Sequence, residues 1–263
     1  MKPQIVSPDN SNQDDANRSW YQDDNFWRIW GRYLFAGRLQ NTAYEVDRII
    51  DFLQLHPGDH VIDLCCGMGR HLLELRRRGY RVTGVDRTDA YLVAAREDAA
   101  REELDIQLVQ EDVRKLNLPA AFDGAVNMYT SFGYFEEYDD DLAFARNVRR
   151  LLRPGGRFLI QTEGKEIMAR NFRAQEWYWH DDGSIGLHQR TIRDGWERID
   201  MRWILVRDGH IEWDGSVSSR IYSAAEMRGL LKAAGFDEVK IFGSMEATPY
   251  DHAATQLVAV AGV

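Results

Sequence analysis

Cysteine is scarce in this chain of 263 residues, and its scarcity limits the kinds of site that the sequence can build. The two cysteines are neighbours, Cys65 and Cys66. Adjacent cysteines rarely pair with each other, so a disulfide framework is excluded and a reducing compartment, the cytoplasm, is expected. A four-ligand zinc site would also need histidines at metal-ligand spacing, and no histidine stands at such a spacing. We therefore expect neither a disulfide nor a metal centre.

Long apolar runs and an excess of basic residues are also missing from the sequence. No run of 18 apolar residues is present, so no membrane span is expected, and residues 1–19 lack the apolar core of a secretion signal. The formal net charge is −9, from 33 basic and 42 acidic residues, whereas a nucleic-acid binder usually carries a basic stripe. The dense basic run at residues 76–81 is interpreted as the cationic end of a helix. The sequence thus favours a small-molecule partner over nucleic acid or membrane, and leaves a homo-oligomer open.

Strand and helix patterns alternate from about residue 57 onward. Short apolar runs predict strands at residues 60–65, 80–86, 106–112, from 122 and 157–162, and amphipathic stretches between them predict helices. Pro154, Gly155 and Gly156 are expected to end the helix before the fifth strand. Such alternation predicts an open, mostly parallel sheet with helices on both faces.

The pattern changes between Glu176 and Tyr222, where the residues favour β structure. Asp-Gly pairs at residues 194–195 and 208–209 separate alternating runs, and such pairs are typical of hairpin turns. We expect a three-stranded antiparallel meander inserted into the α/β domain. Ser223, with Glu226 three residues later, then predicts the capped start of a helix, and two final strands complete the large sheet.

The N-terminal part is expected to have a loose start followed by an aromatic helix. The first dozen or so residues are polar and predicted to be loosely held. Between Trp20 and Phe35 the aromatic residues are dense enough for two interpretations that do not exclude each other. The helix packs on the core, or it forms a lid over a ligand.

The stretch "DLCCGMGRH" (residues 63–71) has the form of a turn that binds a nucleotide-like ligand. Glycines let the backbone approach a ligand closely, and free N–H groups at the start of the next helix can face it. Asp86 ends the second strand, where a carboxylate can accept both ribose hydroxyls, and Asp112 ends the third, near an adenine amino group. Leu72 occupies the position of the third glycine of the dinucleotide fingerprint, which argues against a dinucleotide.

Five segments in order resemble the motifs of the class I S-adenosylmethionine-dependent methyltransferases. They are "VIDLCCGMGRH", "VTGVD", "QEDVRKL", "FDGAVNMYTSFGYF" and "LLRPGGRFLI". The fourth segment, together with a meander before the last helix, further resembles bacterial small-molecule methyltransferases, including amino-sugar N-methyltransferases of antibiotic pathways. The resemblance implies S-adenosyl-L-methionine as cofactor. It also implies a Rossmann-like, mostly parallel seven-stranded sheet with helices on both faces and an inserted antiparallel β meander.

On this basis we expect four segments. They are a loose N-terminus and aromatic helical lid (1–45), a cofactor-binding α/β core (46–168), the inserted meander on the substrate side (169–222) and the C-terminal completion of the core (223–263).

The resemblance also implies roles for individual positions. Asp63, Cys65, Gly67 and Gly69 would line the methionine part of the cofactor. The ribose and adenine would be held by Asp86, Arg87, Glu111, Asp112 and Val113, and the sulfonium bordered by Asn127, Met128 and Tyr129. The family has a glycine where this chain has Cys65. Because cysteine is small, we expect the turn to survive and both cysteines to be space-fillers.

Substrate-side residues are expected from the fourth motif, the meander and the aromatic stretch. Candidate catalytic residues are Tyr129, Ser131 and His180, with His188 as a second candidate base and Glu163 as a group that orients substrate. Candidate substrate and lid residues are Trp20, Tyr21, Tyr33, Tyr134, Trp177 and Trp179, with Trp203 also on the meander.

The implied reaction is an in-line methyl transfer in which the protein aligns the reactants and excludes water. An amine needs only to arrive neutral, whereas a hydroxyl needs a base within hydrogen-bond reach, so we expect N-methylation over O-methylation. Two alternatives remain at this stage. One is a nicotinamide-dependent oxidoreductase, weakened by Leu72 and by the lack of a Tyr-x-x-x-Lys pair. The other is a catalytically silent cofactor-binding protein, since the transfer itself requires no particular side chain.

Overall fold

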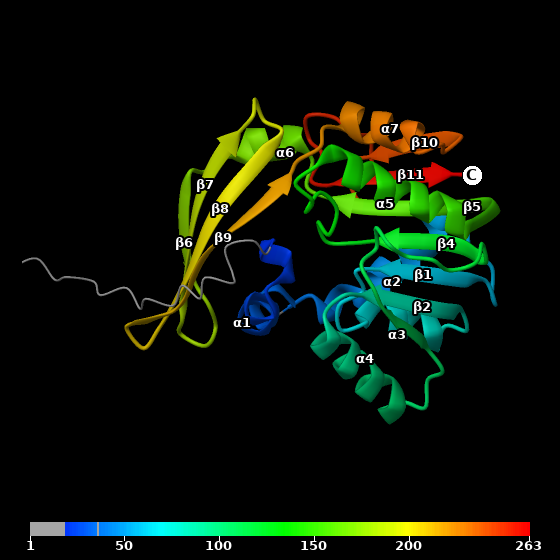
Figure 1. Cartoon of the computed structure of the whole chain (residues 1–263), viewed down its shortest axis with the longest axis horizontal. Helices are drawn as coiled ribbons and strands as arrows, with labels where there is room; N and C mark the ends of the chain where they lie inside the picture. The colour runs from blue at the N-terminus through cyan, green and yellow to red at the C-terminus, as the bar shows by residue number, and fades with distance from the viewer. Residues whose placement is uncertain (1–18, 36) are drawn as a thin grey trace, which may run out of the picture.

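The computed structural model describes residues 19–35 and 37–263, which form two β-sheets with helices around them (Figure 1). The predicted loose start of the chain lies outside the described residues. Among those residues, no helix is both long and apolar enough to cross a lipid bilayer.

The larger sheet has seven strands in the order β10-β11-β5-β4-β1-β2-β3. Its strands are β1 (His60–Leu64), β2 (Arg81–Asp86), β3 (Gln107–Gln110), β4 (Phe122–Asn127), β5 (Leu152–Thr162), β10 (Glu238–Phe242) and β11 (Leu257–Gly262). The pairs among β1 to β5 are parallel, and β11 pairs antiparallel with β5 and β10. The predicted mostly parallel seven-stranded sheet is confirmed.

Strand β1 shows why this sheet lies in the interior. Val61 packs with residues of α2 and α3 on one face, whereas Ile62 and Leu64 pack with residues of α5 and α7 on the other. Side chains alternate between the faces of a strand, so a strand covered on both faces is apolar throughout. The helices are α2 (Thr42–Leu53), α3 (Arg70–Arg77), α4 (Asp89–Arg101), α5 (Tyr138–Leu151), α6 (Lys165–Asn171) and α7 (Ala224–Ala233).

Two helix boundaries test the sequence patterns. Ser223 accepts the Glu226 amide N–H, and the Glu226 side chain accepts the Ser223 amide N–H, so the predicted capping box is present. In contrast, α5 ends at Leu151, and Pro154, Gly155 and Gly156 lie inside β5. The register between β4 and β5 shifts there, and this irregularity accommodates a proline that regular strand pairing would exclude.

The smaller sheet is antiparallel, with the order β6-β7-β8-β9. Its strands are β6 (Gln175–Trp179), β7 (Ile185–Arg193), β8 (Arg198–Arg207) and β9 (His210–Arg220). The expected antiparallel insertion is confirmed, but the predicted count of three strands was wrong. A third Asp-Gly pair, at residues 182–183, lies in the turn between β6 and β7 and is the signal that identifies the fourth strand.

The N-terminal segment lies between the two sheets (Figure 1). It consists of a 3-10 turn, η2 (Trp20–Gln22), and helix α1 (Asp24–Phe35), and a second 3-10 turn, η3 (Leu39–Asn41), leads into α2. Phe26, Ile29 and Trp30 of α1 form a buried cluster with Leu205 of β8 and Val217 of β9. The helix therefore packs on the smaller sheet and faces the C-terminal ends of the parallel strands.

Candidate active site

A cavity of about 830 Å³ lies at the C-terminal ends of β1, β2 and β4. Open α/β sheets bind ligands at this edge. The cavity is bounded by the turn after β1, by η2 and α1, and by β8 and β9 of the smaller sheet. Predicted site residues that line it are Trp20, Tyr21, Asp63, Cys65, Gly67, Asp86, Arg87, Glu111, Asp112, Val113, Met128, Tyr129, Ser131 and Tyr134.

The turn between β1 and α3 is held in left-handed backbone conformations. Cys65 has a φ of 60°, Gly67 of 54° and Gly69 of 77°. A Cβ on Gly69 would lie 3.1 Å from the Cβ of Ala95, so this glycine permits close packing of α4 and does not itself line the cavity. The predicted contact of Gly69 with the cofactor is thus replaced by a packing role, and Gly67 is the glycine that faces the cavity.

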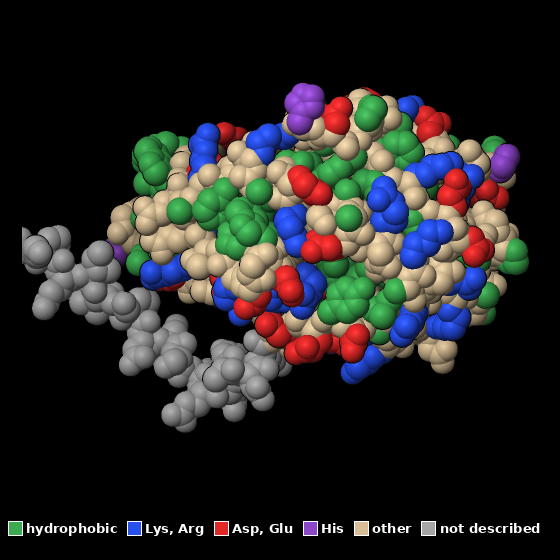
Figure 2. Space-filling view, turned by 90° about the horizontal axis from the view of Figure 1, so that it is seen from above, with side chains coloured by type: hydrophobic (Ala, Val, Ile, Leu, Met, Phe, Trp, Pro, Cys, Tyr) green, Lys and Arg blue, Asp and Glu red, His purple; other side chains and the backbone are tan. Residues whose placement is uncertain are grey.

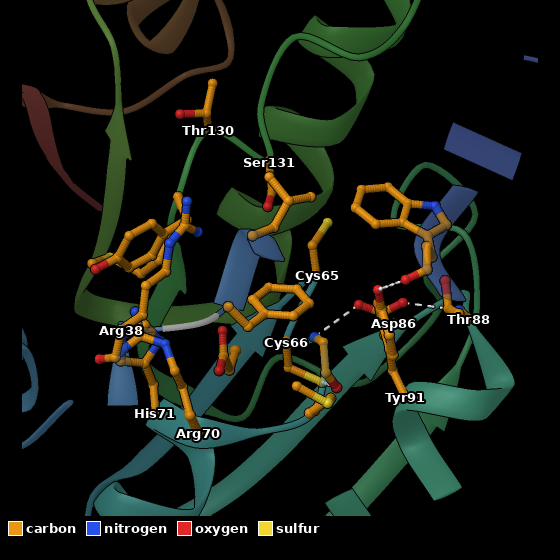
Figure 3. A pocket seen from close by; sticks show the side chains of 18 of the residues that line it. Arg38, Cys65, Cys66, Arg70, His71, Asp86, Thr88, Tyr91, Thr130 and Ser131 are labelled. Carbon is orange, nitrogen blue, oxygen red and sulfur yellow. Dashed lines mark hydrogen bonds between the residues drawn. The ribbon is translucent and has the colours of Figure 1, made fainter. Parts of the chain in front are cut away.

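The two cysteines are partly buried, unpaired thiols. Burial raises the pKa values of both well above the ordinary value, so both thiols are neutral at physiological pH. Within residues 19–35 and 37–263, no three His, Cys, Asp or Glu side chains converge as a metal-binding group. Figure 3 shows Cys65 and Cys66 between the two sides of the cavity.

Asp86 anchors the turn from the end of β2. Its carboxylate accepts the Gly67 N–H at 2.9 Å and the Thr88 N–H at 2.8 Å (Figure 3). Burial raises the pKa of Asp86, and these two hydrogen bonds oppose that rise. Asp86 lines the cavity, and its position next to the glycine turn fits the ribose role that the resemblance implies.

Asp63, near the end of β1, has a buried carboxyl group that forms no ion pair among the described residues. Its side chain is 2% exposed, and Oδ2 has no hydrogen-bond partner among the described residues. Burial raises the pKa of Asp63 to about 7, the charge of Asp86 adds to the rise and Arg70 opposes it. An ammonium group would supply the missing partner, so the residues of this cavity fit S-adenosylmethionine: Asp63 for the methionine end, Asp86 for the ribose and Gly67 for close backbone approach.

The adenine side differs in detail from the sequence expectation. The Asp112 carboxylate is bound by Arg114 at 2.6 Å, and despite burial this contact holds the pKa of Asp112 below its usual range. Arg87 donates to the carbonyls of Tyr21 (2.8 Å) and Gln22 (3.3 Å). Its guanidinium thus ties η2 over the cavity instead of lying free beside a ligand.

Asn127 is fully buried and does not line the cavity. Its Nδ2 donates to the Leu64 carbonyl at 3.0 Å and so links β4 to β1. Of the three residues predicted to border the sulfonium, Met128 and Tyr129 line the cavity and Asn127 does not.

A charged cluster around Tyr129 was not expected from the sequence. The Tyr129 hydroxyl donates to the Glu45 carboxylate, which also binds Arg70 and lies 2.8 Å from His71 Nε2. Although burial opposes it, the hydrogen bonds from His71, Tyr129 and Arg70 lower the pKa of Glu45 to about 2. Arg38 lies 4.2 Å above the Tyr129 ring, and Figure 3 shows Arg38, Arg70 and His71 on the side of the cavity opposite Asp86.

This cluster holds a strained backbone. Tyr129 has a φ of 58° and Thr130 of 60°, and non-glycine residues adopt such values only where their surroundings fix them. The Tyr129 N–H donates to Oε1 of Gln161 (2.8 Å) and the Thr130 N–H to the Gln161 carbonyl (3.2 Å). The Arg70-His71 pair directly after the glycine turn was the available sequence signal. Glu45, 84 positions before Tyr129, gave none.

Aromatic side chains close the cavity opposite the strand ends. The Trp20 ring lies 4.6 Å from that of Tyr134, and Tyr21 stacks on Tyr134 at 6.2 Å. The Trp20 indole N–H donates to the Ser218 carbonyl of β9 at 2.6 Å, which joins this roof to the smaller sheet. The roof offers ring faces to a cation.

Four predicted substrate-side residues lie away from the cavity, and these assignments are corrected. Trp177 and Trp179 are each 63% exposed, because β6 is an edge strand whose alternate residues Glu176 and Tyr178 face inward. The rings of His180 and Tyr33 lie 3.9 Å apart in a tilted arrangement at the β6–β7 turn, where the Tyr33 hydroxyl donates to Asp182. They join α1 to the smaller sheet.

A second chamber of about 780 Å³ adjoins the first cavity. The two share the lining residues Thr130, Met201, Trp203 and Ser219. The second chamber lies between the end of β5, α6 and the smaller sheet, and it includes Glu163 and His188. On the face drawn in Figure 2, basic and acidic side chains are interspersed over the described residues and form no basic stripe.

Comparison with known proteins agrees with this geometry. Residues 61–156 match the family described as "Methyltransferase domain". The chain is 24% identical to dTDP-4-amino-2,3,4,6-tetradeoxy-D-glucose N,N-dimethyltransferase of Saccharopolyspora spinosa, over 82% of this chain and 79% of that protein.

Two solved structures show the same fold. One is an S-adenosylmethionine-dependent methyltransferase from Clostridium acetobutylicum (TM-score 0.74, 18% identity, 91% of this chain and 98% of that chain). The other is CalS10 with bound SAM, an amino pentose methyltransferase from Micromonospora echinaspora involved in calicheamicin biosynthesis (TM-score 0.65, 18% identity, 90% and 95%).

Proposed function

Because the chain is a class I S-adenosylmethionine-dependent methyltransferase, we propose that it methylates the amine nitrogen of a small metabolite, with amino sugars as the leading acceptor class. The observation that carries the proposal is the junction between the two cavities. Its four residues, Thr130, Met201, Trp203 and Ser219, offer hydroxyls, a thioether and an indole, and none of these is a base. A neutral amine needs no base there, whereas a hydroxyl acceptor does.

The name of the Saccharopolyspora relative supports the amino-sugar class. That protein is an N,N-dimethyltransferase of an amino-sugar nucleotide, and CalS10 is an amino pentose methyltransferase. For this chain the same acceptor class is a proposal that rests on the shape and chemistry of the junction.

When bound, S-adenosylmethionine supplies a methyl group already activated on a sulfonium. The protein's part is then to bind, align and exclude water. Asp63 would hold the methionine end of the cofactor and Asp86 its ribose, and the strained Tyr129–Thr130 segment forms the wall where the cavities meet. Tyr129 acts as a positioning residue, because its hydroxyl is already committed to Glu45. The aromatic roof that Trp20 and Tyr134 form would keep water away from the reacting groups.

Turnover on single acceptors tests this function. The purified chain is incubated with S-adenosylmethionine and either the dTDP-linked amino sugar named for the relative, a hydroxyl counterpart of that sugar, or a catechol, and products are identified by mass spectrometry. We expect a mass gain of one methylene on the amine alone. The Asp86→Ala variant should bind S-adenosylhomocysteine at least tenfold more weakly, since charge-assisted hydrogen bonds are worth roughly 1.5–3 kcal/mol each. Methylation confined to the catechol would overturn the proposal.

A further inference from the structure

Two guanidinium groups lie together on the side of the first cavity that is opposite Asp86. Arg38 directly precedes η3, and Arg70 is the first residue of α3. Both line the cavity, and Figure 3 shows them on the same side of it. Their guanidinium carbons lie 4.2 Å and 4.5 Å from the centre of the Tyr129 ring. Two cations therefore lie next to one side chain of the cavity wall.

Arg70 is held in place by one of its two terminal nitrogens. Nη1 donates to the Glu45 carboxylate, to Thr42 Oγ1 at 3.1 Å and to the Arg38 carbonyl at 3.3 Å. Nη2 is buried and has no hydrogen-bond partner among the described residues. The whole side chain is 12% exposed. A buried N–H group without an acceptor costs free energy, so we expect an acceptor from outside the chain at this position.

The cluster around Tyr129 contains one more cation than its acid neutralises. Both oxygens of Glu45 are occupied: Oε1 accepts from the Tyr129 hydroxyl, and Oε2 accepts from Arg70. The Oε2 atom also lies 2.8 Å from His71 Nε2, and because burial lowers the pKa of His71, this imidazole is neutral at physiological pH. In the described part of the chain, no side chain accepts a hydrogen bond from the Arg38 guanidinium, and burial is the largest cause that lowers the pKa of Arg38. The missing partner is an anion.

An unpaired group of the opposite charge lies at the other end of the glycine turn. Asp63 Oδ2 is buried and has no hydrogen-bond partner in the described part of the chain, and the charge of Arg70 acts on this carboxyl group. A ligand that satisfies both Asp63 and Arg70 must present an ammonium group close to an anion. An α-amino acid carries an ammonium group and a carboxylate on one carbon atom, and S-adenosylmethionine has such a group at its methionine end.

We propose that Arg38 and Arg70 bind the α-carboxylate of S-adenosylmethionine, while Asp63 binds the ammonium group on the same carbon atom. Arginine suits this role because its fork of N–H donors matches the two oxygens of a carboxylate. Arg38 lies outside the five motif segments, so the N-terminal part of the chain contributes to cofactor binding as well as to the aromatic roof. This inference concerns the cofactor alone and does not depend on which acceptor atom is methylated.

The test uses two nucleosides that differ by one carboxylate. S-adenosylhomocysteine and its decarboxylated analogue, S-adenosyl-3-thiopropylamine, share the adenosine, the thioether and the amine. Isothermal titration calorimetry gives the dissociation constants of both for the wild type and for Arg38→Gln. We expect the wild type to bind S-adenosylhomocysteine at least tenfold more tightly than the analogue, because the analogue lacks the charge-assisted hydrogen bonds to the carboxylate. Arg38→Gln should bind S-adenosylhomocysteine about tenfold more weakly and should not lose affinity for the analogue.

Two further variants control for effects other than loss of this contact. Arg28→Gln removes a guanidinium from the exposed side of α1, where Arg28 donates to Asn25 at 2.6 Å and does not line the cavity. This variant should match the wild type with both nucleosides. Arg38→Lys keeps the positive charge, and it should bind S-adenosylhomocysteine more tightly than Arg38→Gln does.

Three results would overturn the inference. The first is equal affinity of the wild type for the two nucleosides, and the second is an unchanged affinity of Arg38→Gln for S-adenosylhomocysteine. The third is a parallel loss of affinity for both nucleosides in Arg38→Gln, which would show that Arg38 supports the shape of the cavity and does not bind the carboxylate. None of these results decides which acceptor is methylated. Conversely, methylation confined to a hydroxyl acceptor would overturn the proposed function and leave the role of Arg38 standing.

Discussion

At the scale of single residues, Asp63 has the most unusual environment in the cavity. The carboxyl lies at the end of a buried parallel strand, and burial raises its pKa to about 7 from an ordinary value near 3.9. The folded state therefore binds more protons than the unfolded state between these two values. The free energy of unfolding falls as pH rises through this window, and the cost of the buried charge is present above pH 7.

Replacement of Asp63 by Asn should remove this pH dependence. Relative to the wild type, Asp63→Asn should gain on the order of 2 kcal/mol in the free energy of unfolding between pH 5 and pH 7.5. Urea unfolding of the ligand-free protein, followed by tryptophan fluorescence, measures the difference. Curves of wild type and variant that shift equally with pH would show that the Asp63 carboxyl is ionised throughout.

Cys65 has an unfavourable backbone conformation, because its φ of 60° is disfavoured for a residue with a side chain. Glycine adopts this value freely, whereas a β-branched residue is strongly disfavoured there. We expect Cys65→Gly to bind S-adenosylhomocysteine within about threefold of the wild type, and Cys65→Val to lose about 1–2 kcal/mol of stability. Cys66→Ser is the control for loss of a thiol. Calorimetric melting and titration check all three, and a tolerated valine would contradict the backbone argument.

The sequence could predict those site residues that follow directly from strand ends. Asp63, Asp86 and Asp112 stand where parallel strands stop, so their side chains meet at one edge of the sheet. Glu45 could not be found in this way, because α2 reaches Tyr129 only through the packing of α2 against α3. The hydrogen bond from Arg87 to η2 joins residues 66 positions apart, so the sequence could not predict it either.

At the scale of elements, the N-terminal helix is both a wall of the cavity and part of the core. Phe26, Ile29 and Trp30 are almost fully buried against β8 and β9. Deletion of this helix to test it as a lid would also expose Leu205 and Val217. Point substitutions are therefore the better test of a lid.

Arg87 offers such a substitution, because its two hydrogen bonds fasten η2 across the cavity. Arg87→Ala should speed release of S-adenosylhomocysteine by on the order of tenfold, as the loss of about one net charge-assisted hydrogen bond implies. Arg101→Ala, on the exposed end of α4, is the matched control. Stopped-flow tryptophan fluorescence follows the release. Equal release rates in the two variants would show that η2 does not act as a lid.

Element types were predictable where the period of the apolar residues was clear. The parallel strands and the capped helix α7 follow from local pattern. Strand β6 was missed because only the Asp-Gly pairs at residues 194–195 and 208–209 were used to divide the β-favouring segment, and the pair at 182–183 was not. The extension of β5 to Leu152 depends on its pairing with β4, which local sequence does not contain.

At the scale of the whole molecule, the two sheets form different parts of the site. The parallel sheet presents the cofactor residues, the antiparallel sheet and α6 enclose the second chamber, and the two cavities meet at Thr130 and Trp203. The position of the smaller sheet could not be predicted from sequence, because the contacts that fix it lie far apart in the chain, as from Trp20 to Ser218. The walls that the two sheets share at this junction are therefore set by tertiary packing and not by a motif.

The most direct test of the account uses an acceptor that offers both atoms to the enzyme. A dTDP-4-amino-4,6-dideoxyhexose carries an amine beside a free hydroxyl, and S-adenosylmethionine labelled with ¹³C in its methyl group shows where that group goes. We expect the ¹³C signal of the product to be that of an N-methyl group, and we expect this signal to be several-fold weaker in Asp86→Ala when the cofactor is below saturation. A signal from an O-methyl group would contradict it.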